Sequence, residues 1–240
     1  MIKIENVDVV GWESAIRGMR NPMNSWGKSD SYYHCEIEKG VESCEECQWC
    51  PNPNPNDKHL VVGNNDLNLM KSLVKAGTDH RKFMRMIVVY ADITAPLYWW
   101  KEADTYKVGT VRNSCSTMHK ITEKEFTLED FSHEHLLESG FNNCLLYIIQ
   151  CLNTWREKYL ETNDKRFWWQ IIQILPSSYN QRATLMLNYE VLANMYHSRK
   201  NHKLDEWREF CKWIETLPYS ELITGANNKD LKVGEGANNG

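Results

Sequence analysis

A short segment of the sequence concentrates thiol side chains at spacings that could bind a metal ion. Cys44, Cys47 and Cys50 are separated by two residues each, and Cys35 precedes them. Two-residue gaps allow successive thiolates to converge on one ion, and Cys35 or a flanking histidine can supply a fourth ligand. We therefore predict a tetrahedral zinc site at Cys35, Cys44, Cys47 and Cys50. Free thiols are one alternative. An iron–sulfur cluster is another, although the fourth downstream cysteine of such motifs is absent.

The region around these cysteines, residues 23–60, differs in composition from the rest of the chain. It has few aliphatic residues and contains the run Pro51–Asp57, in which proline and asparagine alternate. Proline removes backbone hydrogen-bond donors and biases its neighbours away from helix. We therefore expect an irregular insert, which a bound metal ion would stabilise.

Hydrophobic periodicity outside the insert predicts a mixture of helices and strands. Alternation over residues 2–10 and the β-rich composition of residues 84–89 indicate strands. Apolar residues at helical spacing indicate helices at residues 12–19, 66–75, 96–107, 127–139, 141–160, 164–174, 180–198 and 204–216. The predicted class is α+β, with a mostly antiparallel sheet packed with helices. We expect a single domain over residues 1–224 and a disordered tail, rich in Gly and Asn, over residues 225–240.

The overall composition is typical of a globular protein, with 42% hydrophobic and 25% charged residues. A net charge of −4 argues against a general nucleic-acid-binding protein. No run of about 18 apolar residues is present, so we expect no membrane span. The N-terminus lacks the apolar core of a signal peptide, so we expect a cytoplasmic protein with reduced cysteines. The residues expected mainly in the core are Trp99, Trp100, Trp168, Trp169, Cys144 and Cys151.

A motif with a defined spacing lies in the C-terminal part of the chain. Leu175 and Pro176 are followed by Asn188, by Arg199 eleven positions later, and by a helix start at Trp207. This run resembles the flavin-dependent thymidylate synthases, in which Leu-Pro precedes an aromatic-rich helix that contains an Asn, with an Arg eleven positions after it. The turn after Arg199 is one residue longer than in that family.

A second stretch resembles the same family more loosely. The segment 75–80 is similar to the family's Gly-His and Glu-His region, and the run from Pro96 is similar to the approach to its Arg-His-Arg signature. Counted from Pro96, residues 105–107 stand at the three signature positions, where Lys107 keeps one cation. Cys115 stands at the signature serine, with a serine beside it. Together, the two stretches cover roughly residues 65–217.

The resemblance implies a function and a set of site residues. Members of the family methylate deoxyuridine monophosphate with a folate carbon donor and reduced flavin adenine dinucleotide (FAD), and their active sites lie between the subunits of a homotetramer. By this resemblance, the nucleotide-binding residues are Arg199, Asn188 and Ser116. By the same resemblance, the cofactor-binding residues are His80, Lys107, Arg112 and His202.

Departures from the family pattern keep other functions open. Most of the signature is lost, and Glu190 stands where the family has a second Arg. An Arg binds phosphate through two parallel hydrogen bonds, which a Glu cannot make. The alternative is a nucleotide-binding or interaction protein of the same fold that has lost the flavin chemistry. Arg199 would then be a surface residue, the histidines would have structural roles, and residues 107–116 would form a solvated loop.

Overall fold

The computed structural model describes residues 2–34, 59–139 and 142–225 of the chain. The predicted metal ligands Cys35, Cys44, Cys47 and Cys50 lie outside these ranges, as does the predicted tail from residue 226 onward. Among the helices within the ranges, none has both the length and the apolar character needed to cross a membrane.

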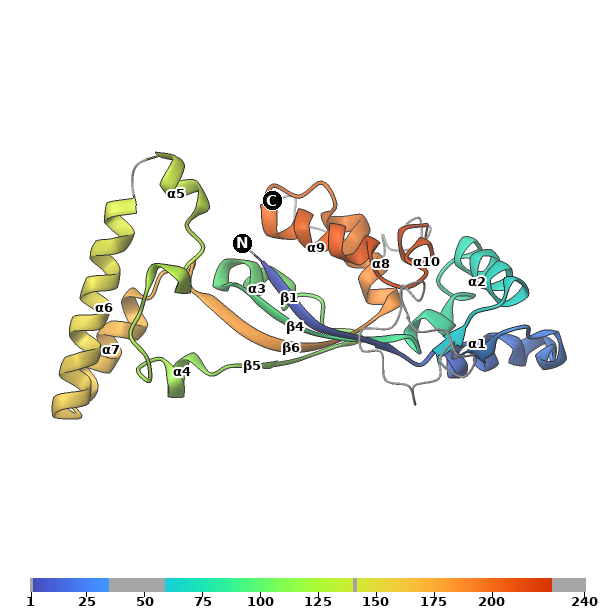
Figure 1. Ribbon diagram of the computed structural model, residues 1–240, viewed down its shortest axis with the longest axis horizontal. Coiled ribbons are helices and arrows are strands. Elements are labelled where there is room, and N and C mark those ends of the chain that lie inside the picture. The colour runs from blue at the N-terminus through green and yellow to red at the C-terminus, as the bar shows by residue number, and fades with distance from the viewer. Residues whose placement is uncertain (1, 35–58, 140–141, 226–240) are drawn as a thin grey trace, which may run out of the picture. The chain divides into compact units, whose positions relative to one another are not determined.

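Four strands form the main sheet (Figure 1). In spatial order they are β1 (Lys3–Val10), β4 (Val88–Pro96), β6 (Asn180–Asn188) and β5 (Thr110–Ser114). Buried side chains alternate with less buried ones along β4 and β6, because successive side chains of a strand point to opposite faces of the sheet. The combination of helices with an antiparallel sheet confirms the predicted α+β class.

A smaller antiparallel sheet pairs β2 (Tyr32–His34) with β3 (His59–Val61). Tyr33 lies opposite Leu60 in this pair. Both strands lie within residues 23–60, so the expectation of an irregular insert is wrong for this described part of it. β2 ends at His34 and β3 begins at His59, and their pairing brings these two residues side by side.

The chain divides into two compact units. Unit 1 comprises residues 1–5, 92–107 and 112–185, and unit 2 comprises residues 6–91, 108–111 and 186–240. Every contact described below lies within one unit.

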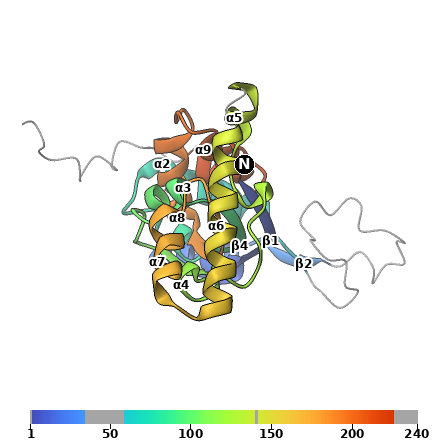
Figure 2. The same cartoon turned by 90° about the vertical axis from the view of Figure 1, so that its left-hand side faces the viewer.

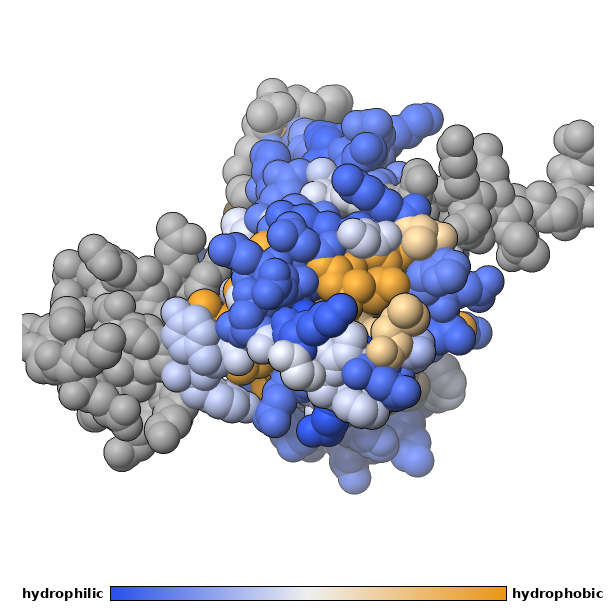
Figure 3. Space-filling view, turned by 90° about the vertical axis from the view of Figure 1, so that its right-hand side faces the viewer, coloured by the Kyte–Doolittle hydropathy of each residue, from blue (hydrophilic) through white to orange (hydrophobic). Residues whose placement is uncertain are grey.

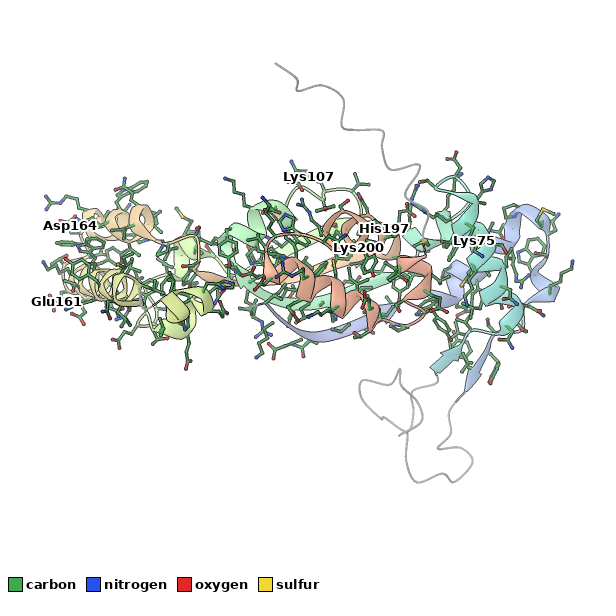
Figure 4. The ribbon with its side chains drawn as sticks, turned by 90° about the horizontal axis from the view of Figure 1, so that it is seen from above. Lys75, Lys107, Glu161, Asp164, His197 and Lys200 are labelled. Atoms are coloured by element: carbon green, nitrogen blue, oxygen red, sulfur yellow. The ribbon has the colours of Figure 1, made fainter. Side chains whose placement is uncertain are left out.

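The core of unit 1 is built mainly from two long helices. The helices and 3-10 turns of this unit are α3 (Leu97–Ala103), α4 (Thr117–Lys120), η5 (Leu128–Asp130), α5 (Glu134–Ser139), α6 (Asn142–Thr162) and α7 (Lys165–Ile174). α6 and α7 pack side by side (Figure 2). Leu152 of α6, Ile171 of α7 and Phe131 belong to one buried apolar cluster. Asp164 begins α7 by accepting a hydrogen bond from the backbone N–H of Arg166 at 2.9 Å (Figure 4).

Unit 2 is organised around one buried helix, α8. The helices and 3-10 turns of this unit are α1 (Trp12–Arg20), η1 (Asn21–Met23), η2 (Trp26–Lys28), α2 (Asn64–Ala76), η4 (Lys82–Arg85), α8 (Tyr189–Arg199), α9 (Asp205–Glu215) and α10 (Glu221–Thr224). α8 packs against α9, α10 and η4. Leu192 and Ala193 of α8 and Trp207 of α9 are fully buried. Because α8 is held on several sides, the residues at its two ends have defined positions.

Several predicted elements are confirmed. The strand at residues 2–10 corresponds to β1. The helices at residues 12–19, 66–75, 141–160, 164–174 and 204–216 correspond to α1, α2, α6, α7 and α9. Trp99 and Trp100 are buried, as predicted. The same expectation is wrong for Trp169, which is 51% exposed, and for Cys144, which is exposed on α6.

The predicted helix over residues 180–198 is wrong in its first half, which forms strand β6. Gln181, Ala183, Leu185 and Leu187 are buried and alternate with less buried neighbours, which is the period of a strand. The helix begins only at Tyr189. Ala and Leu favour helix by intrinsic propensity, but packing of one face of the strand overrides that preference.

Three other predicted boundaries differ from the structure. The strand expected at residues 84–89 begins at Val88, after η4, and the helix expected at residues 96–107 ends at Ala103. The sequence did not predict β5. The helix expected at residues 127–139 is divided into η5 and α5, because Phe131 between them forms an antiparallel bridge with Tyr179.

Candidate functional site

A buried ion pair fixes the beginning of α8 in unit 2. The Arg81 Nε donates to both carboxylate oxygens of Glu190, at 3.2 and 2.9 Å, and its Nη2 donates to Oε1 at 3.0 Å. The side chain of Arg81 is fully buried and that of Glu190 is 13% exposed. Glu190 also lies in the first turn of α8, where a negative charge is favourable to the helix dipole. The negative charge that replaces a cation of the resembled family is therefore neutralised inside this chain.

Asn188, a predicted nucleotide-binding residue, is the N-cap of α8. Its side-chain oxygen accepts a hydrogen bond from the backbone N–H of Val191 at 2.9 Å. The expected position of Asn188 in the middle of a helix is therefore wrong, and capping alone accounts for an asparagine here. Its amide nitrogen lies close to Gly109, where a Cβ would come within 2.3 Å of it. Gly109 has a φ of 78°, which L-residues with a side chain rarely adopt.

Arg199 and His202, predicted for the nucleotide and the cofactor, meet at one indole ring. The guanidinium carbon of Arg199 lies 5.1 Å from the ring centroid of Trp207. The His202 ring lies 6.3 Å from the same indole in an edge-on arrangement, and its Nδ1 accepts a hydrogen bond from the backbone N–H of Leu204 at 3.2 Å. Trp207 is fully buried and so forms a rigid support for both side chains.

His80, a predicted cofactor-binding residue, directly precedes the buried Arg81. Its side chain is exposed, and its backbone N–H donates to the carbonyl of Gly77 at 3.0 Å in the turn after α2. The ion pair between Arg81 and Glu190 therefore links the segment that carries His80 to the start of α8.

The predicted cofactor cations of unit 1 have different surroundings. The guanidinium carbon of Arg112 lies 4.5 Å from the ring centroid of Trp100. The Nη1 of Arg112 lies 3.2 Å from the Oδ1 of Asp104, although without hydrogen-bond geometry. Trp100 is itself held by a hydrogen bond from its Nε1 to the carbonyl of Gln181 at 2.9 Å. Lys107 is exposed and makes no ion pair with any residue that the structure describes (Figure 4).

Ser116 lines a cavity in unit 1 of about 250 Å³, which we call the Ser116 cavity. Ser116 caps α4 by accepting a hydrogen bond from the backbone N–H of His119 at 3.2 Å. The cations in the cavity wall each pair with a carboxylate: Lys120 with Glu123, Lys124 with Asp130, and Arg182 with Asp92. Ion pairs at the protein surface contribute little stability, so an anionic ligand could compete for these cations.

Cys115 and Tyr179 also line the Ser116 cavity. Burial, with smaller contributions from Asp130 and Cys115, raises the pKa of Tyr179 to about 12. Its phenol therefore stays protonated near neutral pH, where it can donate a hydrogen bond. The thiol of Cys115 is exposed. The cavity thus offers hydroxyl donors and Lys and Arg side chains whose ion pairs a ligand could displace. This combination suits a polar, negatively charged ligand.

The fold itself is similar to two solved structures. No model of a known protein family matches the sequence, and no curated protein matches it. Thymidylate synthase X from Helicobacter pylori, solved with FAD and dUMP, is 16% identical with a TM-score of 0.63, over 94% of this chain and 99% of that one. A flavin-dependent thymidylate synthase ThyX from the same organism, complexed with FAD and dUMP, is 16% identical with a TM-score of 0.60, over 92% and 99%. This chain has the thymidylate synthase X fold.

The described part of this thymidylate synthase X fold contains no group of three or more His, Cys, Asp or Glu placed to hold a metal ion. Zinc therefore stays a prediction about the cysteine-rich insert alone. Trp99 and Trp100 are 1% and 2% exposed, so neither indole presents a face on which a flavin could stack.

Sequence reasoning did not identify Arg81 or Tyr179 as important residues. Arg81 lies 109 positions from Glu190, so no local spacing connects the two. Tyr179 follows the Leu-Pro motif, but its role depends on the aromatic rings of Phe126 and Phe131 that pack edge-on against it. The contacts that give both residues their roles form only when the chain folds.

Proposed function

We propose that this protein is a flavin-dependent thymidylate synthase-like enzyme, which methylates deoxyuridine monophosphate with a folate carbon donor and reduced FAD. The main support is the likeness of fold to two such synthases, each solved with FAD and dUMP, over nearly the full length of both chains. The matching interval between Asn188 and Arg199 in the sequence is independent support. In this proposal the enzyme is a homotetramer.

The residues proposed for the nucleotide are Arg199 and Asn188 in unit 2 and Ser116 in unit 1. Arg199 is presented by the end of α8, and its guanidinium would donate charge-assisted hydrogen bonds to an anionic or carbonyl group. Ser116 lies in a wall that also carries three cations held in surface ion pairs. These features suit a phosphomonoester.

The residues proposed for FAD are His80 and His202 in unit 2 and Lys107 and Arg112 in unit 1. The two cations suit the negatively charged diphosphate of FAD. Lys107 makes no ion pair in the described chain, and Arg112 makes an ion pair with the exposed Asp104 that a diphosphate could replace. When bound, reduced FAD would supply the hydride for the reduction. The protein's own contribution would be to bind and orient the nucleotide.

A second candidate function is a nucleotide-binding protein that has lost the flavin chemistry. The observation that favours it is the ion pair between Glu190 and Arg81. Glu190 stands where the resembled family carries a second Arg, and it neutralises the charge of Arg81. Thr105 and Tyr106 likewise stand at two positions of the lost signature.

The test begins with the ultraviolet–visible spectrum of the purified protein without added cofactor. A flavin spectrum that bleaches on reduction is expected of the enzyme. The next step is incubation with reduced FAD, methylene-tetrahydrofolate and deoxyuridine monophosphate labelled with tritium at C5, because methylation at C5 releases that tritium into water. Release that falls in Arg199→Ala but not in Lys203→Ala supports the proposal. A protein that releases no tritium but binds the nucleotide in calorimetry would reject the synthase and support the second candidate.

A further inference from the structure

A second cavity lies in unit 2, and none of the residues proposed above for nucleotide or FAD lines it. It has a volume of about 320 Å³, and we call it the Trp26 cavity. Its walls come from α1, η2, β2, β3 and the segment between η2 and β2. Ile16 and Leu60 give it an apolar lining. Apolar side chains also reach the surface within a largely polar face on the side where α1 and α2 lie (Figure 3).

Two half-exposed aromatic rings line this cavity, and each is held by a hydrogen bond. Trp26 is 51% exposed, and its Nε1 donates to the Oδ1 of Asn21 at 2.8 Å. Tyr33 is 53% exposed, and its hydroxyl donates to the Oε2 of Glu13 at 2.6 Å. Side chains that are already fixed lose little conformational freedom when a ligand binds. Rings exposed in this way suit a flat ligand that covers them.

The two arginines of the cavity differ in availability. Arg20 is 3% exposed, and its donors are engaged by Asp66 at 2.6 Å and by the carbonyls of Ser25 and Lys28 at 3.2 and 3.1 Å. Arg17 is exposed and makes no hydrogen bond or ion pair within the described ranges. Its guanidinium is therefore the cation that remains to bind a ligand.

Glu13 provides the complementary acceptor. It precedes Arg17 by four residues on α1, so both side chains lie on one face of that helix. One carboxylate oxygen of Glu13 accepts the hydrogen bond from Tyr33, which leaves the second oxygen to accept from a ligand. A ligand in this cavity therefore meets an acceptor, a multiple donor and aromatic surface. A simple inorganic anion would use only the donor.

We propose that the Trp26 cavity binds a planar heterocycle with N–H donors and an attached anionic group, the chemistry of a purine nucleotide. The ring lies against Trp26 and Tyr33, its N–H edge faces Glu13, and the anionic group binds Arg17. This site is separate in the chain from Arg199, Asn188 and Ser116, and it does not depend on the proposed synthase activity.

Guanosine monophosphate and guanosine are a matched pair of probes, because they differ only in the phosphate. Binding to the full chain is measured by calorimetry at low ionic strength. Arg17→Gln should weaken guanosine monophosphate roughly tenfold, the effect of losing a charge-assisted hydrogen bond, and leave guanosine unchanged. Trp26→Ala should weaken both ligands by about fivefold or more, because stacking on an aromatic ring is lost.

Two control variants test whether any loss of affinity is specific to this site, or follows from removing any exposed cation or any exposed indole. Lys82→Gln removes an exposed cation of the same unit, and Trp169→Ala removes an exposed indole of unit 1. Neither should change the affinity for either ligand, and Arg17→Gln should not change the affinity for deoxyuridine monophosphate. The proposal is overturned if guanosine monophosphate does not bind at millimolar concentration, or if Arg17→Gln and Trp26→Ala bind it as the unmodified chain does. Equal weakening of both ligands by Arg17→Gln would also overturn it.

Discussion

Arg81 donates hydrogen bonds to both carboxylate oxygens of Glu190, a residue 109 positions further along the chain. The pair joins the turn after α2 to the first turn of α8 within unit 2. It also explains how a negative charge is tolerated at Glu190, where the resembled family has a cation. Since Arg81 is fully buried, its positive charge would be uncompensated without Glu190, and the charge of Glu190 would be uncompensated without Arg81.

Breaking this ion pair should destabilise the fold. Removal of one partner from a buried pair leaves an uncompensated charge, so Arg81→Met or Glu190→Gln should lower the free energy of unfolding by about 3 kcal/mol. Denaturant titration measures this loss. The double variant Arg81→Met with Glu190→Gln should lose less than the two single losses added together. The matched control is Arg182→Gln, which breaks the surface pair with Asp92 and should have little effect. A loss no larger than that of the control would contradict the structural role of the pair.

Asp66 should make the stability of the protein depend on pH in the acid range. Burial raises the pKa of its carboxyl, but hydrogen bonds from Ser31, Ser29 and Arg20 outweigh burial and hold the pKa below its usual value. A carboxyl with a lowered pKa in the folded state stabilises the fold above its unfolded pKa of about 3.9, and this contribution is lost as the pH falls through the folded pKa.

The variant Asp66→Asn tests this dependence. At neutral pH the variant should be less stable by about 3 kcal/mol, because Arg20 loses its charged partner inside the protein. The difference in unfolding free energy between the unmodified chain and the variant should be constant above about pH 5 and should shrink below about pH 4. Urea titrations at pH 7, 5, 4 and 3 measure it. If the difference in unfolding free energy stays constant down to pH 3, the charge of Asp66 does not stabilise the folded protein.

Substitutions at Asn188 can separate its capping role from the proposed nucleotide contact. Asn188→Ala removes the acceptor for the N–H of Val191 and should lower the free energy of unfolding by about 1 kcal/mol. Asn188→Ser keeps a capping oxygen and should restore most of that stability. If Asn188 also contacts the nucleotide, calorimetry should show weakened deoxyuridine monophosphate binding in both variants. Full affinity in the stable Asn188→Ser variant would limit the residue to capping.

Arg199 should contribute to nucleotide affinity more than to stability. Arg199→Ala should weaken the binding of deoxyuridine monophosphate by about 1.5–3 kcal/mol, the range for a hydrogen bond with a charged partner. The loss of its contact with Trp207 should reduce stability by only about 1 kcal/mol. Calorimetry and thermal unfolding measure the two effects, and the exposed Lys203 provides the control variant Lys203→Ala. Unchanged affinity in Arg199→Ala would remove Arg199 from the proposed site.

The local patterns of the sequence were sufficient for most of the helices. α6, α7 and α9 follow from apolar residues repeated at the helical period, and β1 follows from simple alternation. β6 shows where this reasoning fails. Its alternation is present in Gln181, Ala183, Leu185 and Leu187, but several of its residues have high helix propensity. The sequence does not show that β4 and β5 will pair with the two edges of this segment, or that one of its faces will be buried.

The sequence by itself determined the α+β class, the positions of most helices and the spacing of eleven residues between Asn188 and Arg199. These depend on the repeat of a helix or strand, which covalent geometry imposes over a few residues. Only the tertiary structure decided that Asn188 is a helix cap, that Arg199 and His202 share the indole of Trp207, and that Arg81 neutralises Glu190. These relationships join segments distant in the chain. Their energies come from burial and charge pairing, which exist only after the chain has folded back on itself.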